Sequence, residues 1–308
     1  MTPRLSFSLW PSPERDWDEL RGLAQYADSA KWHCLWYADH FMPNTGDASI
    51  IDGDVYECWS VIAAITAITS RLRIGSLVSP TTVRHPAVLA KTAATIDRLG
   101  RGRLVLGIGA GWQINEHRAY GIDLLEAKDR VDRFEEAIRI VRSLLDNETT
   151  AFTGKYFSIA DAPCQPRPIQ SPLPILVGTG GPRMSRITVM HADEWNTWGD
   201  VKGASERLAV IRRACESIDR DPATLRTSAQ ALFFLVDDPA TAAKIIENAP
   251  SSRPMIVGDA HHIASALMSY HQEGFDEIII PDFTLGPTPS ARREMYERFE
   301  TEVLPLVS

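Results

Sequence analysis

Short apolar runs rich in Val, Ile and Leu alternate along this sequence with longer segments whose apolar residues recur every three or four positions. The short runs are typical of buried strands, and the longer segments are typical of amphipathic helices. Strands are predicted on this basis at residues 5–10, 35–38, 72–78, 104–108, 175–177, 194–198, 227–235 and 277–280. Helices are predicted at residues 16–30, 57–69, 86–99, 130–145, from 182 onward, and at 205–218, 239–247, 261–272 and 290–303.

The order of these elements, a strand followed by a helix along most of the chain, predicts an α/β fold with a parallel sheet covered by helices. Eight strands within 308 residues predict a (β/α)8 TIM barrel, and an open doubly wound sheet is the alternative. No change of composition marks a linker, so residues 1–308 are expected to form a single domain. Residues 149–171 do not fit the repeat, because short extended pieces are followed there by several prolines. We expect this segment to be an insertion after the fourth barrel helix, over one rim.

Composition and charge indicate which kinds of molecule this protein is expected to bind. The formal net charge is −8, which argues against nucleic acid or an anionic membrane as a general partner. The N-terminal segment lacks the apolar core of a signal peptide, and the densest apolar run, residues 61–68, is too short to span a bilayer. The four cysteines include no CxxC pair, which favours reduced thiols over disulfides or a zinc site. We therefore expect a cytoplasmic protein with a small-molecule substrate and no metal.

An acid and an imidazole end the second predicted strand, in the stretch LWYADHF at residues 35–41. Barrels place their chemistry on the loops at the carboxyl ends of the strands, so Asp39 and His40 are predicted to lie on that rim. An imidazole changes its protonation near neutral pH, which suits it to move a proton. From position alone, a hydrogen-bonded rim histidine explains His40 equally well.

Two glycine-rich loops follow later strands. The first, GIGAGW at residues 107–112, has Trp112 where a dinucleotide fingerprint needs Gly or Ala, so it predicts close packing or a flat ligand against the strand end. The second, GTGGP at residues 178–182, precedes a helix that begins near Pro182. Free backbone amides and a helix N-terminus attract an anion, so this loop predicts a phosphate site, with Arg183 and Arg186 nearby.

Several motifs together resemble the luciferase-like monooxygenase superfamily, in its bacterial branch. They are WYADHF (36–41), VRHPAVLAKTAATIDRLGRGRLVLGIGAGW (83–112), NEHRAYGI (115–122), FTGKYFSI (152–159), PILVGTGGP (174–182) and HADEWNTW (191–198). The chain looks most like the members that use coenzyme F420. The resemblance implies a TIM barrel, commonly dimeric, with a deazaflavin or flavin at its mouth, and often a cis non-proline peptide after strand three, here within residues 76–81.

The resemblance also distributes roles over this sequence. It implies catalytic roles for His40 and Asp39, with Asp39 orienting the imidazole or contacting the cofactor ring. The residues that it implies for cofactor binding are Ser79, Thr81, Gly109, Ala110, Gly111, Trp112, Gly178, Thr179, Gly180 and Gly181. The residues that we expect on the substrate side are Trp10, Glu57, Asn196 and Trp198. Glu57 also suits a helix N-terminus by charge alone.

Three functions remain open from the sequence. The first is an F420-dependent oxidoreductase that transfers hydride to or from a small organic substrate, expected as a homodimer. The second is an FMN-dependent two-component monooxygenase that uses O₂. The third is a non-catalytic flavin-binding or storage relative, for which His40 would be dispensable. F420 and FMN both carry a ribityl phosphate, so the glycine loop does not separate the first two.

Overall fold

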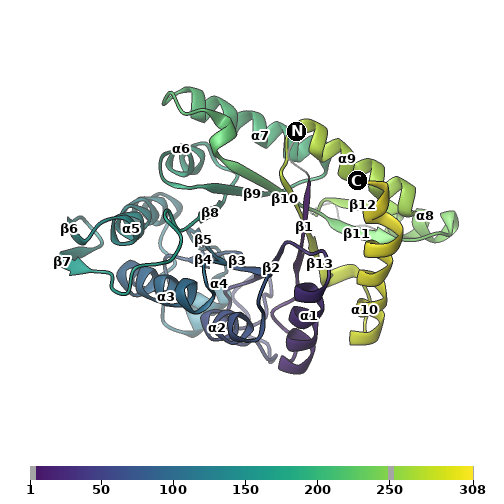
Figure 1. Cartoon of the computed structure of the whole chain (residues 1–308), viewed down its shortest axis with the longest axis horizontal. Helices are drawn as coiled ribbons and strands as arrows, with labels where there is room; N and C mark the ends of the chain where they lie inside the picture. The colour runs from purple at the N-terminus through teal and green to yellow at the C-terminus, as the bar shows by residue number, and fades with distance from the viewer. Residues whose placement is uncertain (1–4, 249–252, 308) are drawn as a thin grey trace.

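A closed ring of parallel strands forms the centre of the molecule (Figure 1). The computed structural model describes residues 5–248 and 253–307. Within these residues the ring follows the order β3, β2, β1, β13, β10, β9, β8, β5 and closes by pairing β5 with β3. Its strands are β1 (Ser6–Trp10), β2 (Cys34–Tyr37), β3 (Arg73–Ser76), β5 (Leu104–Gly109), β8 (Ile175–Gly178), β9 (Glu194–Trp198), β10 (Arg226–Gln230) and β13 (Glu277–Pro281). A short strand, β4 (Ser79–Pro80), follows β3 and pairs with β5. The predicted TIM barrel is confirmed.

Helices lie around the outside of this ring (Figure 1). They are α1 (Trp17–Ser29), α2 (Cys58–Ile68), α3 (Pro86–Leu99), α4 (Ile114–Ala119), α5 (Ala127–Asp146), α6 (Pro182–His191), α7 (Val201–Glu216), α8 (Pro239–Glu247), α9 (Ala260–Glu273) and α10 (Pro289–Arg298). Shorter turns are η1 (Pro222–Thr224), η2 (Asp282–Thr284), the π-helical η3 (Phe299–Val303) and η4 (Leu304–Leu306). Start signals in the sequence fix several boundaries. Asp16 caps α1 by accepting a hydrogen bond from the Glu19 amide at 2.8 Å, and Pro86 is the first residue of α3.

Two segments differ from the predicted elements or add to them. The predicted strand at 227–235 is wrong as a single unit, because it is two strands. β10 stays in the barrel, whereas β11 (Leu232–Leu235) leaves it and pairs with β12 (Met255–Gly258). Polar Gln230 stands directly at this break, but isolated polar residues also occur within continuous strands, so the pattern did not reveal the break. Between α5 and β8, the strands β6 (Thr149–Thr153) and β7 (Ser158–Pro163) form an antiparallel hairpin at the edge of the molecule (Figure 1).

Side chains from the strands form two separate apolar layers. The larger layer lies between the ring and the helices. The smaller one fills the inside of the barrel, where Trp36, Val105, Leu176 and Ile279 are fully buried. Because neighbouring strand residues point to opposite faces, both faces of each barrel strand are buried. The middle of the barrel is therefore a packed core.

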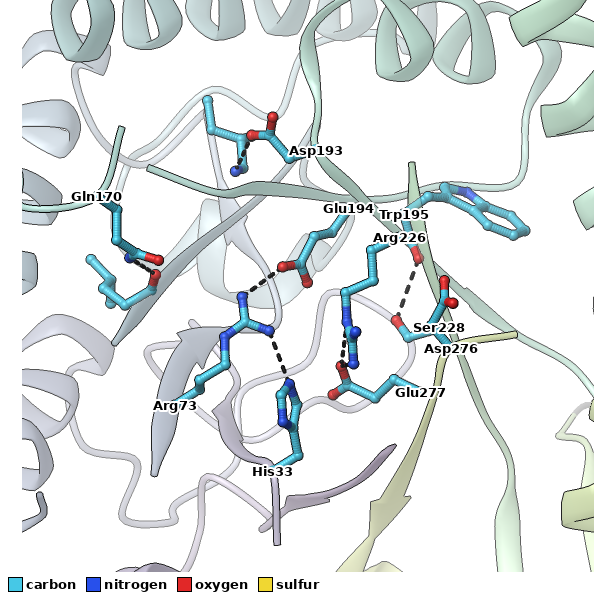
Figure 2. Close-up of polar contacts among 12 residues, drawn as sticks. His33, Arg73, Gln170, Asp193, Glu194, Trp195, Arg226, Ser228, Asp276 and Glu277 are labelled. Atoms are coloured by element: carbon cyan, nitrogen blue, oxygen red, sulfur yellow. Dashed lines mark hydrogen bonds and ion pairs between the residues drawn. The ribbon is translucent and has the colours of Figure 1, made fainter. Parts of the chain in front are cut away.

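Charged residues occupy the end of the barrel where the strands begin (Figure 2). Arg73 of β3 pairs with Glu194 of β9 at 2.6 Å, and Arg226 of β10 pairs with Glu277 of β13 at 3.2 Å. The indole of Trp36 donates a hydrogen bond to Glu277 at 2.9 Å. His33, just before β2, contacts Arg73 at 3.1 Å, and burial lowers the pKa of its imidazole to about 4. We call Arg73, Glu194, Arg226, Glu277 and His33 the basal ion cluster.

Candidate active site

A cavity of about 1080 Å³ opens at the end of the barrel opposite the basal ion cluster. Its walls include Trp10 at the end of β1, His40 after β2, Trp112 after β5 and Trp198 at the end of β9. These residues lie far apart in sequence and meet because parallel strands present their carboxyl ends on one rim. This is the end at which TIM barrels carry their chemistry.

His40 lines this cavity, as predicted, but its partner is not the one expected. Its Nδ1 atom lies 3.1 Å from Oε1 of Glu116, a buried residue of α4. The other Glu116 oxygen accepts a hydrogen bond from the Phe41 amide at 2.9 Å. The expectation that Asp39 orients the imidazole is therefore corrected: Glu116 makes that contact, because α4 faces the loop after β2.

Asp39 instead belongs to an ion pair with Arg84, which also pairs with Glu57. Burial raises the pKa of the Asp39 carboxyl, and the neighbouring Arg84 guanidinium opposes that rise. The second carboxylate oxygen of Asp39, Oδ1, is buried without a hydrogen-bond partner among the described residues. An unsatisfied buried carboxylate oxygen is costly, so it marks a place where a ligand can donate a hydrogen bond.

Glu57 does not line the cavity. Its carboxylate caps α2 by accepting from the Ser60 amide at 2.7 Å and the Trp59 amide at 3.2 Å. Burial favours a higher pKa of Glu57, but a hydrogen bond from the Ser60 hydroxyl at 2.7 Å, together with these two amides and the Arg84 charge, outweighs burial and lowers that pKa. Its position supports the helix-cap alternative given above, and we withdraw the substrate-side assignment.

The third strand is interrupted by a cis peptide bond between Leu77 and Val78. This bond lies within residues 76–81, where the family resemblance placed one. The Val78 side chain packs against glycines of two neighbouring strands. A Cβ added at Gly109 would lie 2.7 Å from it, and one at Gly178 would lie 3.6 Å from it. Gly109 is therefore required for packing, whatever else contacts it.

Ser79 and Thr81 follow this break and are buried. The Ser79 hydroxyl accepts a hydrogen bond from the Trp59 indole at 3.0 Å. The Thr81 hydroxyl has no hydrogen-bond partner within the described part of the chain. Nearby, Gly111 has φ +93°, a left-handed conformation that favours glycine. Ala110 precedes it and is partly exposed.

The second glycine loop leads directly into α6. Gly181 is the cap residue of this helix, and no side chain caps its first amides. A Cβ at Gly181 would meet nothing within 4 Å, and one at Gly180 would approach only Arg207, at 3.9 Å from its Nε. Backbone contacts to β9 hold the loop, since the Thr179 amide donates to the Asn196 carbonyl at 3.3 Å. The loop thus combines open space, uncapped amides and a cation, which suits an anion.

Arg183 is not available to this loop as the sequence suggested. Its guanidinium pairs with Asp132 at 2.5 Å and with Glu135 at 3.0 Å on α5. The cation beside the loop is Arg207 of α7, which donates to Thr197 Oγ1 at 3.2 Å and to the Trp198 carbonyl. The sequence carried no signal for Arg207, because it stands among the other charges of an amphipathic helix.

Aromatic side chains form a large part of the cavity wall. Trp10 lies between Trp198, at a centroid distance of 5.6 Å, and Phe283, at 5.1 Å. Trp112 contacts the edge of the His40 ring at a centroid distance of 5.5 Å and is 57% exposed. Trp10, Trp112 and Trp198 thus line one cavity, and their roles towards cofactor and substrate stay predictions.

Asn196 points into the barrel but does not line the cavity. Its side-chain amide donates to Ser228 Oγ at 2.9 Å, one layer below Trp198. Asn196 could therefore influence a substrate in the cavity only indirectly, through residues such as Trp198 that line it. His117, the histidine of the NEHRAYGI motif, is buried, with its ring nitrogens 2.7 Å from Thr82 Oγ1 and 2.6 Å from the Gln113 carbonyl. It is a packing residue.

Two features of the described residues bear on the class of site. No group of three or more His, Cys, Asp or Glu side chains is arranged to hold a metal ion. No helix among them is long and apolar enough to cross a bilayer.

Comparison with known proteins gives a consistent result. The family model described as luciferase-like monooxygenase matches residues 5–277. An F420-dependent glucose-6-phosphate dehydrogenase of Kineococcus radiotolerans is 27% identical, over 94% of this chain and 93% of that protein. An F420-dependent hydroxymycolic acid dehydrogenase of Mycobacterium tuberculosis is 31% identical, over 74% of this chain and 61% of that protein. The solved coenzyme F420 dependent tetrahydromethanopterin reductase of Methanopyrus kandleri superposes with a TM-score of 0.80 at 17% identity, covering 99% of this chain and 100% of that one.

Proposed function

The chain belongs to the luciferase-like monooxygenase family, and from this membership we propose that it is an oxidoreductase that uses coenzyme F420 to transfer hydride to or from a small organic substrate. The main support for F420 as the cofactor is the similarity of nearly the whole chain to an F420-dependent dehydrogenase. The cavity beside His40 supports a substrate of small-molecule size, because cavities of this order enclose such ligands.

The residues at the barrel mouth fit a flat ring that carries a phosphate. Asp39 Oδ1 and Thr81 Oγ1 are buried polar atoms without partners among the described residues, and a ring with polar edges would satisfy such atoms. We propose that Ser79, Thr81, Gly109, Ala110, Gly111 and Trp112 lie against the ring and its chain. We propose that Gly178, Thr179, Gly180 and Gly181 bind the phosphate with the first amides of α6, aided by Arg207.

Coenzyme F420, when bound, supplies a two-electron hydride carrier. The protein must then move the proton that accompanies the hydride. His40 is the group placed to do so, since its Nδ1 is held by Glu116 and its ring lines the cavity. The Arg84 guanidinium keeps a positive charge beside Asp39, so that the carboxylate can act as a hydrogen-bond acceptor. The aromatic wall of Trp10, Trp198 and Phe283 excludes water from the substrate side.

Comparing the affinities of the protein for the two cofactors tests this proposal. The purified protein is titrated separately with F420 and with FMN, and binding is followed by quenching of tryptophan fluorescence. We expect F420 to bind at least about 10-fold more tightly than FMN, a difference of about 1.4 kcal/mol. Tighter binding of FMN would replace the proposal with the monooxygenase alternative.

The F420 affinity and the turnover of the His40→Gln variant distinguish an enzyme from a protein that only stores the cofactor. We expect F420 affinity within about 2-fold of the wild type, because His40 is not one of the groups assigned to cofactor binding. We expect hydride transfer, measured by F420 absorbance, to fall by about 100-fold or more. A variant with full turnover would remove His40 from the mechanism and would favour a binding protein.

A further inference from the structure

We propose that Glu116 is a positioning residue that fixes the tautomer and the direction of the His40 ring. The inference rests on the proposed function, because it concerns the proton-moving group of that site. The inference goes beyond the proposed function because it assigns a positioning role to Glu116, a carboxylate that does not line the cavity.

Both oxygens of Glu116 are used on two consecutive residues of one loop. Oε1 lies 3.1 Å from His40 Nδ1, and Oε2 accepts from the Phe41 amide at 2.9 Å. Glu116 is 2% exposed, so water does not compete for these oxygens. The His40 side chain, by contrast, is 19% exposed.

The segment around α4 holds the rest of the same loop. Gln113 donates from its side-chain amide to the Met42 carbonyl at 3.0 Å, and Asn115 donates to the Pro43 carbonyl at 2.8 Å. The Tyr120 hydroxyl donates to the Phe41 carbonyl at 3.3 Å. Residues 40–43 are thus bound by a single short stretch of chain, which we call the α4 brace (residues 113–120). Contacts to successive carbonyls restrain the backbone that carries His40.

The chemistry of a carboxylate then decides the ring's tautomer. An ionised carboxylate accepts hydrogen bonds and cannot donate them, so the proton of a neutral His40 must reside on Nδ1. Nε2 consequently presents a lone pair, and it has no hydrogen-bond partner among the described residues. A lone pair on Nε2 can take a proton from a substrate hydroxyl when hydride leaves, and the protonated ring can return one in the opposite direction.

Replacement by glutamine reverses this arrangement without changing the shape of the side chain. In Glu116→Gln the amide oxygen is needed by the Phe41 N–H, which leaves the NH₂ group facing His40 Nδ1. Nδ1 must then be unprotonated, and the proton moves to Nε2. A residue with a purely structural role would hold the loop in both proteins and would not move the proton.

The tautomer is measured directly by NMR of protein labelled with ¹³C and ¹⁵N in histidine, at about two pH units above the usual histidine pKa of about 6.5. His40→Gln identifies the His40 signals among those of the 8 histidines. We expect Nδ1–H in the wild type and Nε2–H in Glu116→Gln. The control is Glu148→Gln, an exposed glutamate outside the brace, which should keep Nδ1–H.

Nε2–H in the wild type, or the same tautomer in the wild type and Glu116→Gln, overturns the proposal. The wild-type spectrum alone decides the matter if Glu116→Gln does not fold. The measurement needs no cofactor, so its outcome is independent of the F420 titration. Failure of F420 to bind with Nδ1–H observed would remove the proposed function and leave the positioning of His40 established.

Discussion

At the scale of single residues, the rim is organised by charged side chains that each serve more than one partner. Arg84 joins Asp39 to Glu57, and Glu116 joins His40 to the backbone of the next residue. Such buried groups depend on one another, because removing one partner leaves the other desolvated and unpaired.

Arg84→Met should therefore lower the free energy of unfolding by about 3–5 kcal/mol, the typical cost of breaking a buried ion pair. Asp39 would lose the guanidinium that opposes the rise of its pKa, so this carboxyl should become protonated at higher pH. Urea unfolding at pH 7 measures the loss. The double variant Arg84→Met/Asp39→Asn should be more stable than Arg84→Met, and Arg186→Met, at an exposed arginine, should be neutral. A double variant no better than Arg84→Met would contradict the pairing.

The glycines beside Val78 give a second prediction for single residues. Gly109→Ala brings a methyl group to 2.7 Å from Val78 Cγ2 and should cost about 1–3 kcal/mol of stability. Val78→Ala should relieve that cost in the double variant. It should not rescue Gly107→Ala, because a Cβ at Gly107 meets the backbone carbonyl of Ser76. Thermal unfolding of the wild type, the three single variants and the two double variants with Val78→Ala checks both statements.

At the scale of elements, the sequence determined the barrel more fully than it determined the site. Start signals such as Asp16 and Pro86 stand within one residue of the helices that they begin, and every predicted barrel strand is present in the ring. Failures arose where local pattern carries no information. The break after Gln230 falls within a stretch, residues 227–235, whose mixed polar and apolar pattern also suits one continuous strand. The contact of Glu116 with His40 joins residues 76 positions apart. Polar groups far apart in sequence pair because of the way helices and loops pack together in three dimensions. That packing cannot be read from a single sequence.

The start of α6 provides a prediction for one element. Gly180→Asp places a negative charge beside the uncapped amides, which should repel a phosphate and reduce F420 affinity by about 10-fold or more. The stability of the protein should not fall, since acids are favourable at a helix N-terminus. Gly180→Ala is the matched control, because its methyl group enters open space. Equal loss of F420 affinity in both variants would show that shape, and not charge, matters there.

At the scale of the whole molecule, the barrel has two chemically different ends. Ion pairs lie at the end where the strands begin (Figure 2). The cavity lies at the end where the strands finish. Glu277 is fully buried, and His33 lies near it with a pKa of about 4. The stability of the fold should therefore depend on pH through residues that are remote from the site.

His33 sets the direction of that dependence. An unfolded histidine binds a proton near pH 6.5, whereas folded His33 does so only near pH 4, so the unfolded state binds more protons between these values. The free energy of unfolding should fall as the pH is lowered through this window. His33→Gln should show a shallower decline, measured by urea unfolding at pH 7, 5.5 and 4.5, about the range over which one proton is taken up. Parallel curves for the two proteins would rule out this assignment.

The packed interior above the basal ion cluster has a consequence for turnover. Trp36, Val105, Leu176 and Ile279 are fully buried across the middle of the barrel, so the cavity is a cup and not a channel. Substrate and product would therefore reach and leave His40 at the same end of the barrel. Trp112, an exposed indole, lines the cavity at this end, so molecules bound one after the other would have to share the space beside it.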